Sequence, residues 1–483
     1  MGHLVVEQPL AKTPRANTRL NGYLIGSTLV AAVGGFLFGF DTVVISGTNE
    51  MLVNLFKLTP AELGFTVASA LVGTVIGSLI SGKPAEVWGR KPVLMLLAVL
   101  YFVTAIGCGL AWNWTSLLVF RFIGGLAIGG ASVVSPMYIA EISPPHARGR
   151  LVAVSQLNIV AGLLVANISN FIIAWLTTSV VNGVAVPDPM AWRWMLGIVA
   201  LPAVMFMFLI MPIPESPRWL VKQHRREEAR DVLERLGNED ADGVLKEIVD
   251  SLHEETVGAD EAFFRRKYMR PILLAFMVAS FNQLAGINAV LYYSADIFRM
   301  AGAERTGALA QAIIIGMTNL IFTMLGMSLI DRFGRRKLLL SGALGLATCL
   351  GTTAYAFYMS EQIASGQLPQ SSMSIVGPLV LASLIGFVAF FAFSLGAVIW
   401  VFIAEIFPNR VRARGQALGS FTHWAWCALI NFTFPVIVDR VSPAAPFVFF
   451  AAMMVLQLVL VWKFLPETKG VSLEEMQRHL GIE

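Results

Sequence analysis

Residues 89–111, GRKPVLMLLAVLYFVTAIGCGLA, decide the fold class of this chain. A short polar start leads into a run of about twenty nearly all apolar residues, the length at which an α-helix crosses the hydrocarbon core of a bilayer. Residues 334–357, GRRKLLLSGALGLATCLGTTAYAF, repeat this order. The pair predicts membrane helices that occur in two related halves of the chain.

Apolar stretches of this kind fill most of the 483 residues, of which 56% are hydrophobic and 14% charged, with a mean hydropathy of +0.70. Soluble domains carry about 25% charged residues, so lipid must be the main solvent of this chain. The runs do not alternate in polarity as the strands of a membrane barrel would. Twelve spanning helices are predicted, near residues 22–46, 63–82, 92–111, 115–140, 150–176, 191–212, 271–298, 307–330, 337–359, 375–404, 413–438 and 445–465.

Internal repeats indicate how the helices are grouped. Gly89 and Gly334 lie 245 residues apart, Glu141 and Glu405 lie 264 apart, and a Pro-Glu pair at 214 recurs 252 residues later. Such repeats are typical of transporters, which hold the substrate near mid-membrane between the repeats. We therefore expect an all-α membrane protein with two pseudo-symmetric six-helix bundles and short intracellular helices. Its expected divisions are an N-terminal tail at 1–20, a bundle at 21–213, a helical linker at 214–270, a second bundle at 271–466 and a C-terminal tail at 467–483.

Positive charge predicts the orientation. Of the 35 Lys and Arg residues, 29 fall in the two tails and in the connections that share their side of the membrane. By the positive-inside rule both termini are cytoplasmic. The short polar tails and the lack of a targeting segment fit the inner membrane of a bacterium.

The polar segment between the sixth and seventh spans is the largest connection. Its apolar residues recur at helical spacing, for example at Ala229, Val232, Leu233 and Leu236, so we expect short amphipathic helices that cover the membrane bundles. The chain has no phosphate loop, nucleophile elbow or metal-ligand cluster. The sequence therefore predicts no enzyme activity, no cofactor, no metal, no nucleic acid and no obligate protein partner.

Asp41 and Arg121 are the clearest charges inside predicted spans. Intramembrane charges are costly and commonly mark proton or ion pathways. A nearby cation favours an ionised carboxylate, so a motion that separates the pair would raise its proton affinity. Asp41 is thus a candidate proton carrier with Arg121 as its modulator; the alternative is a static pair that holds the first and fourth spans together.

A second group inside the spans is polar without acidic side chains. Amides offer donors and acceptors that can replace water around a polyol, and aromatic rings can cover its C–H face. Taken singly, such residues more often join membrane helices, but the set suggests an uncharged hydroxylated substrate. For His423 we expect a neutral hydrogen-bonding role. The residues are Gln156, Asn282, Gln283, Asn288, Asn319, Trp400, His423 and Trp424.

Two glutamates at predicted span ends, Glu141 and Glu405, each precede a pair of arginines. The repeat suggests ionic clasps between the halves that form when the cytoplasmic side closes and break when it opens. A permanent interfacial anchor is the alternative. The arginines are Arg148 and Arg150 in the first half and Arg412 and Arg414 in the second.

Together these motifs resemble the sugar porter family of the major facilitator superfamily, in particular its bacterial proton-coupled members. The resemblance runs from about residue 20 to 475 and rests on residues 39–42, 89–91, 121–125, 214–218, 283–288, 331–336 and 466–470. It implies alternating access of two six-helix bundles, with a protonatable carboxylate at Asp41. Tyr292 and Gly396 join the implied sugar site, while the implied gating residues also include Glu86, Arg90, Glu215, Arg218, Asp331, Arg335, Arg336 and Glu467.

Several positions depart from the family pattern and leave the substrate open. Asn282 stands in place of a glutamine, Leu163 replaces a second glutamine of a pentose symporter, His423 replaces an amide, and Ala397 replaces a proline. Glu86 stands where the family usually has Asp. We expect a proton-coupled importer of a neutral monosaccharide, such as glucose, galactose or xylose. The alternatives are an inositol or polyol symporter, a passive sugar uniporter and a sugar sensor that does not transport.

Overall fold

The computed structural model describes residues 20–181, 184–258, 263–471 and 473–482. Within these ranges twelve helical segments are long and apolar enough to cross a membrane, which confirms the predicted all-α membrane class. Their bounds are Gly22–Gly47, Pro60–Ile80, Arg90–Gly109, Trp114–Ile142, Arg148–Thr177, Ala191–Ile210, Arg266–Tyr292, Arg305–Ile330, Arg335–Ala364, Gln370–Ile406, Arg410–Arg440 and Ala445–Phe464.

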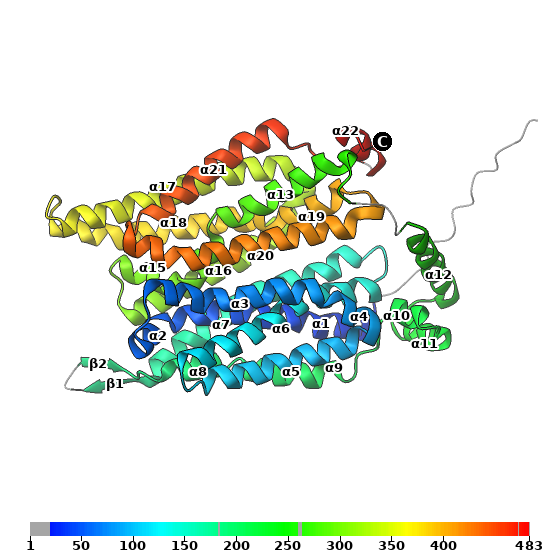
Figure 1. Cartoon of the computed structure of the whole chain (residues 1–483), viewed down its shortest axis with the longest axis horizontal. Coiled ribbons are helices and arrows are strands. Elements are labelled where there is room, and N and C mark those ends of the chain that lie inside the picture. The colour runs from blue at the N-terminus through cyan, green and yellow to red at the C-terminus, as the bar shows by residue number, and fades with distance from the viewer. Residues whose placement is uncertain (1–19, 182–183, 259–262, 472, 483) are drawn as a thin grey trace, which may run out of the picture.

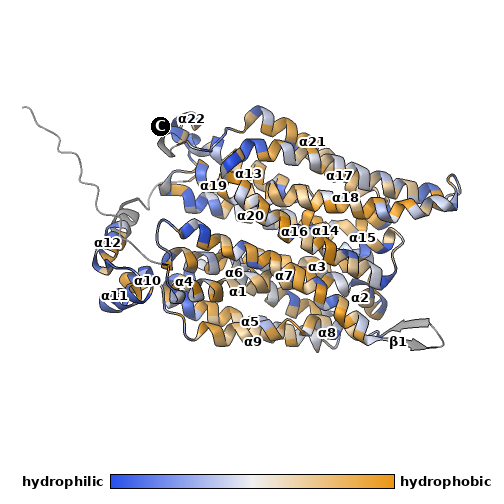
Figure 2. Cartoon of the chain, turned by 180° about the vertical axis from the view of Figure 1, so that it is seen from behind, coloured by the Kyte–Doolittle hydropathy of each residue, from blue (hydrophilic) through white to orange (hydrophobic). Residues whose placement is uncertain are grey.

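The spans form two layers, one from each half of the chain (Figure 1). The first layer contains α1 (Gly22–Val44) with η1 (Ile45–Gly47), α3 (Pro60–Ile80), α5 (Arg90–Gly109), α6 (Trp114–Ile142), α7 (Arg148–Thr177), α8 (Ala191–Gly197) and α9 (Ala200–Ile210). The second contains α13 (Met269–Leu284), α14 (Ile287–Tyr292), α16 (Arg305–Phe333), α17 (Arg335–Ala364), α18 (Met373–Phe393), α19 (Leu395–Ile406), α20 (Asn409–Arg440) and α21 (Ala445–Phe464). Apolar residues follow the length of both layers, as lipid contact requires (Figure 2).

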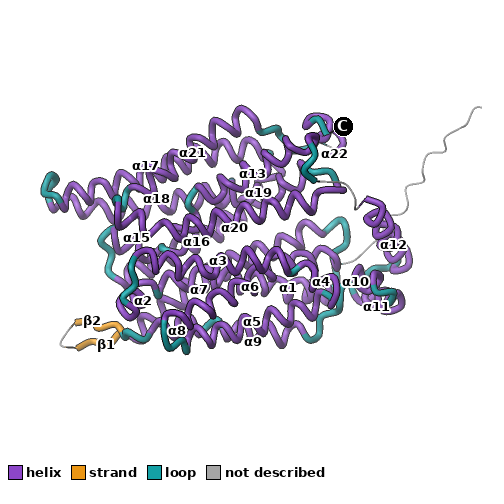
Figure 3. The backbone as a smooth tube through the Cα atoms, in the orientation of Figure 1, coloured by secondary structure: helices purple, strands orange, loops and turns teal. Residues whose placement is uncertain are grey.

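The two ends of the molecule differ (Figures 1 and 3). The hairpin end carries the antiparallel strands β1 (Thr178–Val181) and β2 (Val184–Pro187), together with α2 (Asn49–Phe56), α15 (Ser294–Met300) and η3 (Gln370–Ser372). The linker end carries α4 (Gly82–Trp88), α10 (Pro217–Lys222), α11 (Arg226–Arg235), α12 (Ala241–Gly258), η2 (Arg266–Tyr268) and α22 (Leu473–Leu480).

Local sequence fixes several helix starts at these ends. Thr59 and Glu62 form a capping box at the start of α3, with Pro60 as the first helical residue. Asn113 and Ser116 form a second box at the start of α6. Capping satisfies backbone N–H groups that the first turn of a helix leaves without partners, so these polar residues define where each span begins.

Most contacts between the two halves are made by two helix pairs, α3 with α20 and α7 with α16. On α3, a side chain at Gly64 would overlap the carbonyl oxygen of Phe432 on α20. On α16, a Cβ at Gly316 would lie 3.2 Å from the Cα of Leu164 on α7. Small residues allow membrane helices to approach this closely, so glycine sets the spacing of both pairs.

In the second half, the predicted spans 271–298 and 375–404 are each broken in the middle. α13 ends before Gly286, which has a φ of +85° and leads into α14. α18 ends at Ser394, where the backbone leaves helical geometry before α19. Broken helices at mid-membrane expose backbone groups that ligands can reach, so both breaks are natural site positions.

The linker and the end of the chain are also helical. Trp219, Leu220, Val221 and Ala229 from α10 and α11 form a small apolar cluster against which Leu245 and its neighbours on α12 pack. Trp219 Nε1 donates to the Glu86 carbonyl at 2.9 Å and fixes α10 on the first half. Where a tail was expected at 467–483, α22 packs against α19, with Met476, Leu480 and Ile482 buried.

Candidate functional site

An amide cluster lies at the two broken spans. Gln283 and Asn282, at the end of α13, are 1% and 2% exposed. Gln283 Nε2 donates to Asn282 Oδ1 at 2.9 Å, and Asn288 Nδ2 donates to Gln283 Oε1 at 2.8 Å. Asn282 Nδ2 reaches the carbonyl of Leu395 at 3.3 Å, which joins the break before α14 to the break before α19.

Aromatic residues cover this cluster. Both ring nitrogens of His423 lie 3.2 Å from Gln283 Nε2. The His423 ring lies between Trp400 and Trp424, with centroids 5.4 and 4.8 Å away, and Phe38 of the first half packs edge-on against Trp424. Neutral amides beside indole rings provide the hydrogen bonds and apolar faces that a polyol ring needs.

The structure thus brings together six of the predicted substrate residues: Asn282, Gln283, Asn288, Trp400, His423 and Trp424. Gln156 is half-buried on α7, and Asn319 is buried on α16, where its Oδ1 accepts from Thr323 at 3.4 Å. Tyr292 is buried at the end of α14, and Gly396 is in the first turn of α19. None of the described hydrogen bonds joins Gln156, Asn319 or Gly396 to the cluster.

The two predicted intramembrane charges do pair. Arg121 Nη1 on α6 donates to Asp41 Oδ2 on α1 at 3.1 Å. The Arg121 side chain is 1% exposed and that of Asp41 19%. A fully buried guanidinium without a counter-charge would be strongly destabilising, so the pair is held together by the low dielectric around it.

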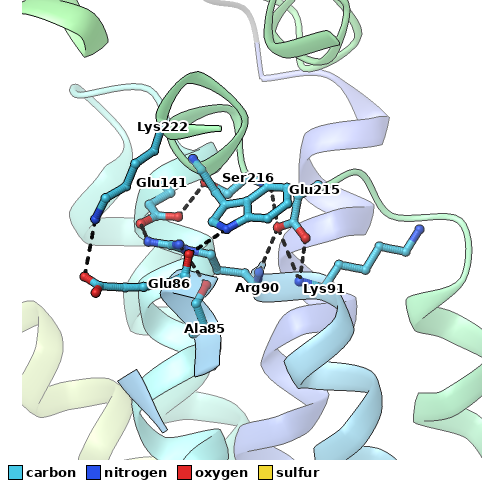
Figure 4. Close-up of polar contacts among 9 residues, drawn as sticks. Ala85, Glu86, Arg90, Lys91, Glu141, Glu215, Ser216 and Lys222 are labelled. Atoms are coloured by element: carbon cyan, nitrogen blue, oxygen red, sulfur yellow. Dashed lines mark hydrogen bonds and ion pairs between the residues drawn. The ribbon is translucent and has the colours of Figure 1, made fainter. Parts of the chain in front are cut away.

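At the linker end of the first half, α5 begins inside a polar network (Figure 4). Arg90 Nη2 pairs with Glu141 at 2.7 Å, while Nη1 donates to the Ala85 carbonyl. The Glu215 carboxylate accepts backbone N–H bonds from Arg90 at 2.9 Å, from Lys91 and from Ser216. Burial raises the pKa of Glu215, although these donors favour its ionised form. The network ties the start of α5 to the end of α6 and to the linker.

The second half repeats this network. Arg335 Nη2 pairs with Glu405 at 2.7 Å, and Thr468 also donates to Glu405. Glu467 accepts backbone N–H bonds from Arg335 at 2.8 Å and Arg336 at 3.1 Å. Gly89 and Gly334 precede the two arginines with φ of +105° and +84°, which explains the glycine in both motifs.

The inter-half clasps of Glu141 and Glu405, expected when the cytoplasmic side is closed, stay a prediction. Each glutamate pairs inside its own half, with Arg90 or Arg335, because those buried guanidinium groups need a counter-charge more than exposed ones do. Arg148 and Arg150 are exposed, so their charge is solvated, and Arg414 is exposed as well. Arg412 Nε donates to the Phe407 carbonyl at 3.4 Å.

The remaining gating candidates occupy the same end. Glu86 pairs with Lys222 at 3.6 Å on the surface, and Arg336 donates to the Trp462 carbonyl. Arg218 is half-buried on α10. The side chain of Asp331 lies outside the described part of the chain.

The hairpin end holds polar contacts across the halves that the sequence reasoning missed. Asn49 Nδ2 on α2 donates to Asp296 Oδ2 on α15 at 2.7 Å and to the Tyr292 carbonyl at 3.2 Å. Glu50 pairs with Arg299 at 2.7 Å. Arg299 and Arg305 are among the few Lys and Arg residues that do not lie on the positively charged side of the membrane. This departure in the sequence could have pointed to ion pairs at the hairpin end.

A family model described as "Sugar (and other) transporter" matches residues 27–480. The chain is 36% identical to the D-xylose-proton symporter of Escherichia coli (strain K12), over 95% of this chain and 96% of that one. It is 33% identical to the glucose transport protein of Synechocystis sp., covering 96% and 99%.

Its fold matches a partially occluded inward-open structure of the xylose transporter XylE from E. coli. The TM-score is 0.80 at 34% identity, with 94% of this chain and 100% of that chain covered. A match of this extent includes both layers and the linker.

Proposed function

We propose that this chain, which belongs to the sugar porter family of the major facilitator superfamily, carries a neutral monosaccharide into the cell together with a proton. The observation that carries the proposal is a buried Asp41–Arg121 pair in the same membrane domain as an uncharged amide and indole cluster. The cluster fits a hydroxylated ring, and Asp41 supplies one group that can take and release a proton.

The favoured substrate is a hexose such as glucose or galactose, and xylose is a further candidate. A matching pair of relatives named for xylose and for glucose supports the class of neutral monosaccharides.

Two observations support alternating access. Contacts between the halves gather at the hairpin end, where Asn49 meets Asp296 and Glu50 meets Arg299. At the linker end the described ion pairs of the two glutamate networks each lie within one half. The linker end carries most of the positive charge and is therefore the cytoplasmic side in this proposal, so the conformation is closed to the outside.

Replacing Gln283 by alanine should weaken sugar binding. The side chain is the centre of the amide cluster. Losing two neutral hydrogen bonds to the sugar, of about 1 kcal/mol each, lowers affinity by roughly tenfold or more. Equilibrium binding of labelled glucose and xylose to purified protein measures the change. Gln367→Ala, at an exposed position, is the matched control and should bind as wild type. Equal affinity of both variants would place the sugar elsewhere.

Outer pH should bias the closed hairpin end. Asp296 lies on α15, beyond the end of the seventh span at Tyr292. Burial raises its pKa from 3.8 to about 6, although the hydrogen bond from Asn49 and the charge of Arg299 favour the ionised form. Opening would return the carboxyl to water and lower its pKa. The closed form therefore binds the proton more tightly, so protonation as pH falls through 6 stabilises closure and ionisation above 6 weakens it.

The test uses a protein without its native cysteines that carries Ser46→Cys at this contact, labelled from outside with an impermeant thiol reagent. Labelling relative to an exposed Arg440→Cys reference should fall several-fold between pH 7 and pH 5. Asp296→Asn should flatten this dependence. If the labelling ratio of Ser46→Cys to Arg440→Cys changes with pH in Asp296→Asn as much as it does with Asp296 present, this carboxyl does not control closure.

The proposed function is tested in proteoliposomes, with and without an inward proton gradient. Labelled glucose is offered with excess unlabelled xylose, galactose or inositol in parallel samples. Gradient-driven accumulation above the outside concentration supports symport, and the strongest competitor names the substrate. Equilibration without accumulation would mean a uniporter, and binding without flux would mean a sensor.

A further inference from the structure

A small pocket lies beside the Asp41–Arg121 pair, inside the first half. Its lining includes Asp41 on α1, Tyr101, Thr104 and Cys108 on α5, Arg121 on α6 and Leu196 on α8. The amide cluster is built from the second half, so this pocket and the proposed sugar site are separate.

Two buried side chains line this pocket without filling their hydrogen-bonding capacity. Arg121 uses Nη1 for Asp41, whereas its Nε and Nη2 have no partner among the described residues. The Tyr101 hydroxyl likewise has none. Both residues are 2% exposed. In a membrane interior each such donor costs several kcal/mol if it stays without an acceptor.

The chemistry of the lining selects the ligand. The Nε and Nη2 groups can only donate, and the Tyr101 hydroxyl needs an acceptor, while Oδ1 of Asp41 can accept. The Thr104 hydroxyl donates its hydrogen to the Leu100 carbonyl at 2.7 Å, so toward the pocket its oxygen can only accept. A water molecule can accept from Arg121 and Tyr101 and donate to Asp41 and Thr104, which matches the two to four partners of a buried water.

We propose that the pocket binds ordered water between Arg121, Tyr101 and Asp41, and that Tyr101 is thereby a positioning residue for the proton of Asp41. The inference deepens the proposed symport and rests on it. Tyr101 acts by orienting the water so that its hydrogens face the carboxylate. Water held in this way stabilises the ionised carboxylate, because hydrogen bonds to the charged form favour that form.

Removing the Tyr101 hydroxyl should therefore disturb the water and weaken the hydrogen bond that the Asp41 carboxyl receives from it. The other titratable groups among the described residues that interact with Asp41 are Arg121 on α6, Cys108 on α5 and Tyr292 on α14. All three are unchanged in Tyr101→Phe, which also keeps the ring in place. A change in the pH profile would then belong to the hydroxyl and its water.

The experiment is an infrared titration of the protonated carboxyl band in the purified full chain. Asp41→Asn identifies the band by removing it. In Tyr101→Phe the frequency of the band should change, because the carboxyl loses the hydrogen bond of the ordered water, and the pH profile of uphill sugar uptake should change with it. Tyr358→Phe, at an exposed position on α17, is the matched control and should show the wild-type band and profile.

The outcomes separate the two proposals. If no band disappears in Asp41→Asn, the proton-carrier function fails. If the band is removed by Asp41→Asn but has the same frequency in wild type and Tyr101→Phe, the water site fails. A second readout uses the wild-type protein alone: an O–H stretch that shifts in ¹⁸O-labelled water and changes as Asp41 titrates is expected, and its absence overturns the inference even where Tyr101→Phe does not fold.

Discussion

Asp41→Asn is expected to abolish accumulation of sugar against its gradient while sugar exchange continues. Asparagine has nearly the shape of a protonated aspartate but cannot release or take up a proton. The sugar cluster, built from the second half, is left intact. In proteoliposomes with an inward proton gradient, the ratio of inside to outside sugar should fall to about one, since a carrier without proton exchange can only equilibrate its substrate.

The loss of charge opposite Arg121 needs its own control. A buried guanidinium left without a carboxylate costs about 3 to 5 kcal/mol when the group stays charged, so the variant is also compared by thermal unfolding. Asp439→Asn, at an exposed carboxylate near the hairpin end, controls for the chemistry of the substitution. Accumulation at the wild-type level in Asp41→Asn would remove the carrier role and leave a static pair.

The fold was predictable because lipid imposes a simple rule. Inside lipid each span must satisfy its backbone N–H and C=O groups within one helix, and the bilayer thickness sets the length of that helix. Hydropathy alone therefore places the twelve spans to within a few residues. The repeats at Gly89 and Gly334 then predict two halves, and both recur as turns of positive φ. The family resemblance is confirmed by the match over residues 27–480.

The breaks in the spans were not predictable from hydropathy, because the mean hydropathy of both segments, 1.5 and 2.5, is high enough for a continuous membrane span. Gly286 takes a positive φ at a point where the ring of Phe450, far along the chain, occupies the space of a side chain. The break at Ser394 carries no glycine or proline of its own. Tertiary packing therefore decides where these helices stop.

The pairing of charges shows a second limit. Glu141 lies close in sequence to Arg148 and Arg150, yet its partner is Arg90, 51 residues away. Nearness along the chain favours contact only on one helix face, whereas Glu141 ends α6 and the two arginines start α7. The hairpin-end contact of Asn49 with Asp296 spans 247 residues and depends on how the halves close.

Gly64→Trp is expected to stop transport while leaving sugar binding from the hairpin side. In the closed hairpin end the backbone of α20 occupies the space of any side chain at this position, since the Cα of Phe432 lies 3.2 Å from a Cβ built there. An indole fits only if α3 and α20 separate, which is the motion that opens this end. The variant should therefore be held open to the outside, and net uptake should fall by about 100-fold or more, because excluding the closed form removes one half of the cycle.

The comparison variant is Gly351→Trp on α17, a membrane helix position with no atom near an added Cβ, and it should transport as wild type. Labelling of Ser46→Cys from outside should rise in Gly64→Trp, because that position is buried between the halves when the hairpin end is closed. Gly316→Trp, on the other inter-half pair, should act in the same direction. Normal transport with tryptophan at position 64 would mean that the halves do not separate along α3 and α20, and alternating access by this motion would be wrong.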